Sequence, residues 1–246
     1  KMHHFFAEEK NIDNGFITIK GSDVNHIKNV LRMKKGEELL ISNGADKDYY
    51  CKIDEISNDE IRAKIYDIDK VGNELDTEFY LFQCLPKGDK MELIIQKAVE
   101  LGVREIIPVA SKRAIVKLDE KKADSKVKRW NLISESAAKQ SGRIIIPKVK
   151  KPMTFGEAVK YTENMDMSII PYENYKDMNE TRKIIDKMQP GMRIGIFIGP
   201  EGGFDEGEIE AAVKAGIERI SLGRRILRTE TAGMAILSVL MFKMER

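Results

Sequence analysis

The sequence predicts a chain of two domains, a small β-barrel over residues 1–72 and an α/β domain over residues 73–246. In the first part, short runs that alternate apolar and polar residues lie between Gly, Asn and Asp turns, which is typical of half-buried strands. In the second part, continuous apolar runs of strand length alternate with amphipathic segments, which indicates a parallel sheet with helices on both faces.

The first domain is predicted to contain several short strands and one helix. The helix covers residues 22–31, with Ser22 as its N-cap. So many short strands in so short a segment favour a small barrel, which leaves no free sheet edge. Small barrels often bind RNA, but the segment has slightly more acidic than basic residues, so its charge supports RNA binding only at one basic cluster, 28–36. The predicted strands are 3–7, 16–19, 37–42, 49–56 and 60–68.

The second domain is predicted to alternate strands and helices. Gly102 closes the first helix, and the long second helix is strongly basic. The predicted strands are 79–85, 104–110, 167–171, 193–199 and 219–223, and the predicted helices are 87–101, 120–140, 178–187, 206–215 and 230–243.

Composition narrows the class of protein. The longest apolar run, 232–242, is interrupted by Ser238 and is too short to span a bilayer, and the first residues contain no signal-peptide core. The net charge of +2 gives no overall basic field. Cys51 and Cys84 lie in separate strand-like runs, so we expect buried thiols rather than a disulfide framework or a metal site. We therefore expect a cytoplasmic protein without membrane or metal.

Three strand ends in the second domain carry unusual sequence: "SIIP", "IFIGPEGGF" and "SLGRRILRTET". In an open parallel sheet, ligands bind beyond the carboxyl ends of the strands. Glycines there leave bare main chain, which together with Ile and Leu suits a flat neutral ring such as adenine. The alternative is a set of ordinary strand-to-helix turns. Neither glycine turn has the order of a P-loop or a dinucleotide fingerprint, which disfavours an NAD-type oxidoreductase.

The pair "IGPEGGF" and "LGRRILRTETA" resembles the C-terminal signature of the RsmE family, the 16S ribosomal RNA uridine-N3 methyltransferases of the SPOUT class. Similar segments run along the whole chain: "HHFF", "HIKNVLRMKKGEEL", "KGDKMELIIQKAVELGV", "PVASKRAIV", "RW" and "ESAAKQSGR". The start "MHHFF" departs from the family, which often has Arg before the Phe pair, and this leaves the beginning of the RNA surface in doubt.

The resemblance implies an RNA-binding, PUA-like β-barrel over 1–72 and a trefoil-knotted SPOUT domain over 73–246 that binds S-adenosylmethionine (SAM) and forms a homodimer. The implied reaction is methylation of N3 of a uridine, position 1498 in the family, in 16S ribosomal RNA of the small subunit. The implied cofactor contacts, mostly from main chain, are Ile170, Pro171, Ile198, Gly199, Pro200, Gly202, Gly203, Leu222, Gly223, Ile226, Leu227 and Thr229.

Uracil N3 carries a proton, so methylation needs a general base or a cation that stabilises the uracil anion. Arg228 and Arg225 are predicted for the second role, and Glu201 and Glu230 are the candidate bases. Each carboxylate has a structural alternative: a turn contact for Glu201, and for Glu230 charge complementarity at a helix start capped by Thr229. The predicted RNA contacts are His26, Arg32, Gln140, Arg143 and Arg224.

Three points stay open in the sequence. The lysines of helix 120–140 either contact RNA or form a solvated face, and Trp130 is predicted in the core rather than stacked on a base.

The last helix is apolar nearly all round, which indicates burial by a second subunit or inside one chain. The alternative functions are a SPOUT enzyme acting on another base or a ribose 2′-hydroxyl, and a non-catalytic RNA-binding ribosome-assembly factor. Both intact cofactor turns favour an enzyme.

Overall fold

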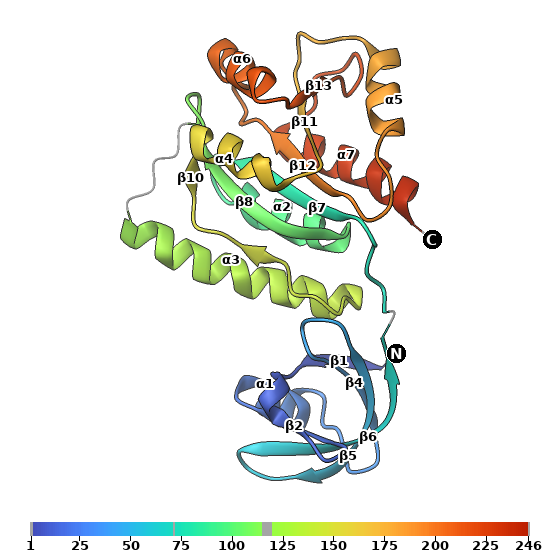
Figure 1. Cartoon of the computed structure of the whole chain (residues 1–246). Coiled ribbons are helices and arrows are strands. Elements are labelled where there is room, and N and C mark those ends of the chain that lie inside the picture. The colour runs from blue at the N-terminus through green and yellow to red at the C-terminus, as the bar shows by residue number, and fades with distance from the viewer. Residues whose placement is uncertain (1, 71, 115–119, 246) are drawn as a thin grey trace. The chain divides into compact units, whose positions relative to one another are not determined.

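The computed structural model describes residues 2–70, 72–114 and 120–245, and the chain divides into two compact units (Figure 1). The first unit is Lys1–Glu74 with Ala138–Ile146, and the second is Leu75–Ala137 with Pro147–Arg246. The segment 138–146, which the sequence pattern places in the second domain, therefore belongs to the first unit. The end of the "PVASKRAIV" match, Ile115 and Val116, lies outside the described residues.

The first unit is a six-stranded sheet in the order β1-β4-β5-β6-β3-β2. Its pairings are antiparallel except for β1 with β4. Inward residues from β1, β3, β4, β5 and β6 share one hydrophobic core, to which Ile12 of β2 adds a partly buried side chain, as expected for a barrel-like sheet. The strands are β1 (His3–Phe6), β2 (Ile12–Asp13), β3 (Phe16–Lys20), β4 (Glu38–Ser42), β5 (Asp48–Ile56) and β6 (Glu60–Asp69).

The predicted helix of this unit is shorter than its pattern suggests. Helix α1 covers only Ser22–Asn25 and continues as a π-helical turn, His26–Val30. The prediction of Ser22 as N-cap is wrong, because Gly21 holds that position with φ 74° and no side chain caps the helix. A positive φ is readily adopted by glycine, which explains why the chain turns there without a polar cap.

The second unit contains a seven-stranded sheet in which every pairing is parallel. The order is β10-β8-β7-β12-β11-β13, with β9 also paired to β8. The predicted parallel α/β domain is confirmed. The strands are β7 (Glu78–Cys84), β8 (Val103–Ala110), β9 (Lys148–Val149), β10 (Met153–Thr154), β11 (Met167–Pro171), β12 (Arg193–Ile198) and β13 (Glu218–Ile220).

Helices cover both faces of this sheet (Figure 1). Helices α4 and α6 pack on one face, where Phe82 stacks on Phe197 with ring centroids 4.5 Å apart. Helices α2 and α7 pack together on the other face. All five predicted helices of this domain are present, and α4 is an additional one. The helices are α2 (Lys90–Glu100), α3 (Glu120–Ser141), α4 (Phe155–Tyr161), α5 (Met178–Asp186), α6 (Glu206–Lys214) and α7 (Thr229–Met244).

Helix α4 was not predicted because it spans only seven residues. Its start nevertheless carries a sequence signal, a capping box in which the Thr154 hydroxyl accepts the Glu157 N–H and Glu157 accepts the Thr154 N–H. Asp205 and Glu208 form the same motif at the start of α6. These local bonds satisfy N–H groups that a helix start would otherwise leave unpaired.

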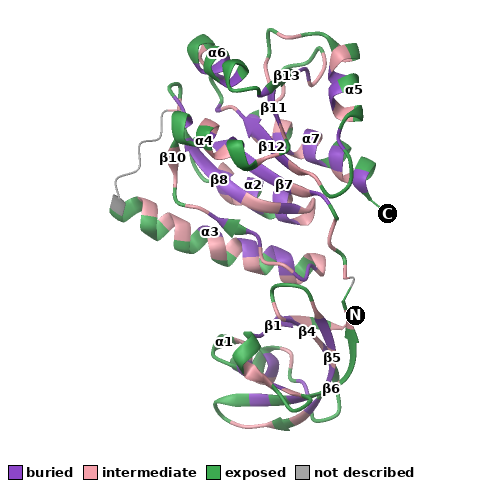
Figure 2. Cartoon of the chain, viewed as in Figure 1, coloured by how far each residue is buried: buried purple, intermediate pink, exposed green. Residues whose placement is uncertain are grey.

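Burial is concentrated along the central strands β7 and β12 (Figure 2). Cys51 and Cys84 are free and buried, as predicted, and burial raises the pKa of each thiol to about 12. Trp130 is 2% exposed, which confirms its predicted place in the core. Among the described residues, no helix combines the length and apolarity needed to cross a membrane.

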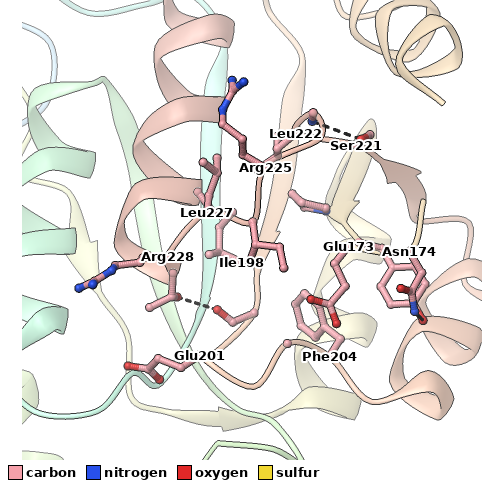
Figure 3. Close-up of a pocket in the computed structure, with 18 of the residues that line it drawn as sticks. Glu173, Asn174, Ile198, Glu201, Phe204, Ser221, Leu222, Arg225, Leu227 and Arg228 are labelled. Carbon is pink, nitrogen blue, oxygen red and sulfur yellow. Dashed lines mark hydrogen bonds between the residues drawn. The ribbon is translucent and has the colours of Figure 1, made fainter. Parts of the chain in front are cut away.

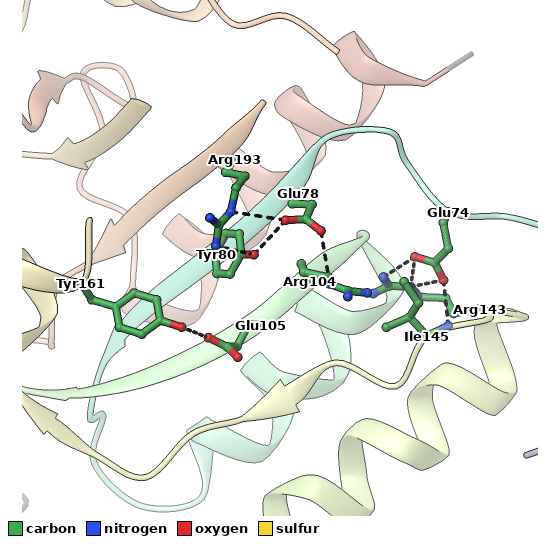
Figure 4. A network of polar contacts seen from close by, with 9 residues as sticks. All are labelled: Glu74, Glu78, Tyr80, Arg104, Glu105, Arg143, Ile145, Tyr161 and Arg193. Carbon is green, nitrogen blue, oxygen red and sulfur yellow. Dashed lines mark hydrogen bonds and ion pairs between the residues drawn. The ribbon is translucent and has the colours of Figure 1, made fainter. Parts of the chain in front are cut away.

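The amino ends of β7 and β12 carry a polar network (Figure 4). The Tyr80 hydroxyl donates to Glu78 at 2.8 Å and accepts from Arg193 at 3.2 Å, and Arg193 also lies 3.5 Å from Glu78. These side chains pair with one another at this edge of the sheet, although Arg193 Nε makes no hydrogen bond among the described residues. The opposite edge, at the carboxyl ends of the strands, holds the candidate site.

Candidate active site

A cavity of about 610 Å³ lies at the carboxyl ends of β11, β12 and β13 (Figure 3). Its size is in the range of small-molecule sites. Three chain segments form most of its wall: 171–176 after β11, 198–204 at the end of β12, and 221–229 between β13 and α7. These are the three strand ends that the sequence singled out. Lys90 of α2 and Ala232 of α7 complete the lining.

Most of the predicted cofactor and catalytic residues line this cavity. Ile170 does not, because its side chain is fully buried in the core beneath the sheet edge. Gly202 does not, and its carbonyl accepts a hydrogen bond from Arg113 at 3.2 Å. The predicted residues in the wall are Pro171, Ile198, Gly199, Pro200, Glu201, Gly203, Leu222, Gly223, Arg224, Arg225, Ile226, Leu227, Arg228 and Thr229.

Several lining residues were not among the predicted site residues. Phe204 ends the strand-end sequence "IFIGPEGGF" without an assigned role, Ser221 directly follows β13, and the others fall in the segment after β11 or on helices. Polar side chains directly after a strand end could have pointed to the residues of the segment after β11. The additional lining residues are Lys90, Tyr172, Glu173, Asn174, Lys176, Phe204, Ser221 and Ala232.

The glycine loop 198–204 is shaped by close approaches. Gly203 has φ +66°, and its N–H closes a turn on the Pro200 carbonyl at 2.9 Å. A Cβ on Gly203 would lie 3.4 Å from the Glu173 carboxylate, and a Cβ on Gly199 would lie 3.2 Å from the Phe204 ring. Glycine at these two positions lets the loop pack tightly beside the cavity.

Thr229 differs from its predicted role as the N-cap of the last helix. The N-cap is Arg228, which makes no side-chain capping bond, and Thr229 is the first residue of α7. The buried Thr229 hydroxyl instead donates to the Gly199 carbonyl at 2.6 Å and accepts from Gln83 Nε2 at 2.9 Å. Thr229 therefore joins the third wall segment to the second.

The two candidate bases are both engaged by Lys90. Glu201 accepts the Lys90 ammonium at 2.8 Å and the Lys87 N–H at 3.1 Å, and Glu230 lies 3.6 Å from the same ammonium. Burial raises the pKa of Glu201, but the Lys90 contact and backbone donors outweigh it and hold that pKa below the ordinary value. A carboxylate with a lowered pKa is a weaker base, so this geometry does not favour Glu201 as the proton acceptor. Glu230 does not line the cavity.

The third wall segment, 221–229, carries three cationic side chains. Arg224, Arg225 and Arg228 are all exposed, and none has a carboxylate partner within the part of the chain that the structure describes. Arg225 and Arg228 project in different directions from the segment (Figure 3). Three neighbouring guanidinium groups without carboxylates suit an anionic ligand. Over the same described residues, no group of three or more His, Cys, Asp or Glu side chains could hold a metal ion.

The remaining predicted RNA contacts belong to the first unit. His26, Arg32 and Gln140 are exposed, and Arg32 has φ 55°, an uncommon conformation for a residue other than glycine. Arg143 is only 4% exposed, and its guanidinium pairs with Glu74 (Figure 4). This burial does not support the predicted RNA contact of Arg143.

The chain matches two family models. Residues 73–241 match an RNA methyltransferase domain, and residues 19–66 match an RNA methyltransferase PUA domain. The predicted PUA-like assignment of the first domain is thereby confirmed.

Close relatives cover nearly the whole chain. The ribosomal RNA small subunit methyltransferase E of Bacillus subtilis is 35% identical over 231 residues, which is 93% of this chain and 90% of that protein. Its counterpart in Mesomycoplasma hyopneumoniae is 36% identical and covers 96% of this chain and 98% of its own length. The structure of a ribosomal RNA small subunit methyltransferase E from Neisseria gonorrhoeae, bound to S-adenosyl methionine, has a TM-score of 0.86 at 31% identity and covers 99% of this chain and 98% of that one. With one family model matching more than half of its length and relatives above 30% identity, the chain belongs to the RsmE family, ribosomal RNA small subunit methyltransferase E.

Proposed function

We propose that this protein transfers a methyl group from SAM to N3 of one uridine in the 16S ribosomal RNA of the small subunit. The observation that carries the proposal is the cavity whose wall joins three strand ends through glycine main chain, beside three exposed arginines. Relatives that cover the chain are named for methylation of small-subunit ribosomal RNA.

The residues present fit SAM. Ile198, Leu222 and Leu227 offer apolar contacts for a flat ring, and the Glu173 carboxylate offers a partner for a positive charge. A Cβ on Gly223, which has φ +102°, would meet no atom within 4 Å, so this position leaves space beside the main chain. Bound there, SAM supplies a methyl group activated by its sulfonium.

The chain's own residues then act on the uracil. Burial raises the pKa of Glu201 but Lys90 and backbone donors lower it more, and Glu230 does not line the cavity, so neither carboxylate is favoured as the base. Stabilisation of the uracil anion by a cation is proposed instead, with Arg228 beside the cavity as the first residue for it and Arg225 as the second. Arg224 is proposed to hold an RNA phosphate. In the first unit, His26, Arg32 and Gln140 are the proposed RNA contacts.

The test uses small ribosomal subunits that lack the modification, with radiolabelled SAM as methyl donor. The proposal expects label in 16S RNA and 3-methyluridine in the digested nucleosides, identified by mass spectrometry. Label on a ribose 2′-hydroxyl or on another base would show that the enzyme is an RNA methyltransferase with a different target atom than uridine N3. SAM binding without transfer to any RNA would favour the ribosome-assembly factor.

The fold and assembly proposed for the second unit are those of a SPOUT domain. A trefoil knot is proposed for this domain because the chain belongs to the RsmE family. A homodimer is supported by α7, because Val239 is 51% and Phe242 84% exposed. The alternative of a last helix buried within one chain is therefore wrong. The proposed substrate places the enzyme in the cytoplasm, and transfer is expected to be unaffected by a metal chelator.

A further inference from the structure

Gln83 is a buried amide at the carboxyl end of β7, and its side chain bonds to Thr229 at the end of the wall segment 221–229. Its side chain is 0% exposed. The amide nitrogen donates to the Cys84 carbonyl at 3.0 Å and to the Thr229 hydroxyl at 2.9 Å, and that hydroxyl donates to the Gly199 carbonyl at 2.6 Å. A single chain of hydrogen bonds therefore runs from β7 through α7 to the loop after β12.

The direction of this chain is determined by chemistry. The Cys84 carbonyl can only accept, so the Gln83 atom facing it must be the amide nitrogen. The same nitrogen then donates to Thr229, whose hydroxyl has one proton to give. That proton is directed to Gly199, the first glycine of the loop. Because Gln83 donates to the Thr229 hydroxyl, that hydroxyl is left to donate its own proton to the Gly199 carbonyl.

The arrangement costs stability. Gln83 Oε1 is buried and has no hydrogen-bond partner among the described residues. A buried acceptor without a partner is destabilising, and an apolar side chain at the same place would avoid that cost. Gly233 lies against this amide, since a Cβ there would be 3.8 Å from Gln83 Oε1 and 3.8 Å from Ile198. The start of α7 is thus packed closely on the strand end that forms the cavity wall.

We propose that Gln83 is a positioning residue for the methyl donor: by fixing the Thr229 proton on the Gly199 carbonyl, it holds the wall segments 198–204 and 221–229 in the arrangement that binds SAM. Gln83 does not line the cavity and acts through Thr229. The inference rests on the proposed function, because it assumes that SAM occupies this cavity.

The first test measures SAM affinity by isothermal titration calorimetry, without RNA. Thr229→Val keeps the shape and removes the hydroxyl, so the Gly199 carbonyl and the Gln83 amide lose their partner; we expect the dissociation constant to rise about tenfold or more. Thr229→Ser keeps the hydroxyl and is expected to restore most of the affinity. The matched control is Thr162→Val, because Thr162 is buried in the same unit and its hydroxyl donates to Val159 at 2.6 Å, away from the cavity.

The second test reverses the hydrogen bond. In Gln83→Glu, an ionised carboxylate can only accept, so it takes the Thr229 proton away from Gly199. A protonated carboxyl has one O–H, which can donate to the Thr229 hydroxyl in place of the amide, although the bond to the Cys84 carbonyl is then lost. Because burial raises the pKa of a carboxyl, we expect the affinity of this variant, relative to the unmodified protein at the same pH, to be reduced at about pH 8 and to recover toward about pH 5.5.

The pH ratio is measured within one folded variant, so it does not depend on Thr229→Val being stable. Reduced affinity that recovers at low pH supports the inference. Affinity equal to that of the unmodified protein, or a loss of the same size at both pH values, overturns it. If the unmodified protein itself gives no SAM binding, the proposed function fails, and this outcome is distinct from a failure of Gln83 alone.

Discussion

Arg143 offers a test that separates packing from RNA contact. Its guanidinium is buried in the first unit, with Nε 3.2 Å from both oxygens of Glu74, and Glu74 also accepts the Ile145 N–H at 3.1 Å (Figure 4). Arg143→Met removes the charge and keeps much of the side chain's length. Glu74 would then keep its charge, with its side chain only 18% exposed, and would lose the guanidinium.

The magnitude follows from that burial. Removing one partner of a buried ion pair destabilises by about 3–5 kcal/mol, and the lower end applies here because part of the Glu74 side chain reaches solvent. We therefore expect Arg143→Met to lower the free energy of unfolding by about 3 kcal/mol. The double variant Arg143→Met, Glu74→Gln should regain much of this loss, since no unpaired charge remains.

Urea denaturation followed by two signals measures the effect. The single tryptophan, Trp130, lies in the second unit, so its fluorescence reports that unit, while far-UV circular dichroism reports both. We expect the dichroism transition to move to lower urea more than the fluorescence transition. A variant with unchanged stability but weaker RNA binding would refute the structural role and restore the predicted RNA contact.

Three further predictions follow from the site, the last helix and the barrel. Arg228→Ala should leave SAM affinity within about threefold while lowering the transfer rate about 100-fold, measured by single-turnover methylation, and an unchanged rate would remove Arg228 from catalysis. Phe242→Glu, at an 84% exposed position, should convert a dimer to monomers in sedimentation equilibrium, whereas an unaltered mass would place any interface elsewhere. Burial lowers the pKa of His4 below its ordinary 6.5, so the unfolded state takes up the proton first; stability is full above pH 6.5 and falls as pH drops toward the folded pKa. His4→Phe should flatten this acid-side loss in thermal melts taken along a pH series, and an identical pH profile would contradict the assignment.

The sequence predicted the second domain well because its strands are buried on both faces. After Arg193, the run "IGIFI" of β12 is apolar without interruption, which is typical of a parallel strand covered on both faces, and Gly102 and Gly216 end their helices with positive φ. The sequence could not show that 138–146 packs with the first unit. That association depends on pairs distant in the chain, such as Asn73 with Gly142 and Lys139 with Asp23, and such pairs leave no periodic signal.

The glycine-bearing parts of the candidate site could be predicted from the sequence. The side chains that reach the site from distant parts of the chain could not. Gly199, Gly203 and Gly223 stand out in the sequence because glycines at strand ends leave main chain accessible to a ligand. All three line the cavity. Lys90 reads as an ordinary exposed residue in the first turn of α2, and only the fold places its ammonium between Glu201 and Glu230. Gln83 reads as one polar residue in a strand, and its link to Thr229 crosses 146 positions of sequence.

The central claim is that main chain at three adjoining strand ends holds the methyl donor. A crystal structure of the protein grown with SAM tests this most directly. We predict density for SAM in the cavity lined by Pro171, Gly199 and Leu222, with the Thr229 hydroxyl still bonded to the Gly199 carbonyl. Density for SAM at another place on the chain, or none at saturating concentration, would contradict the account.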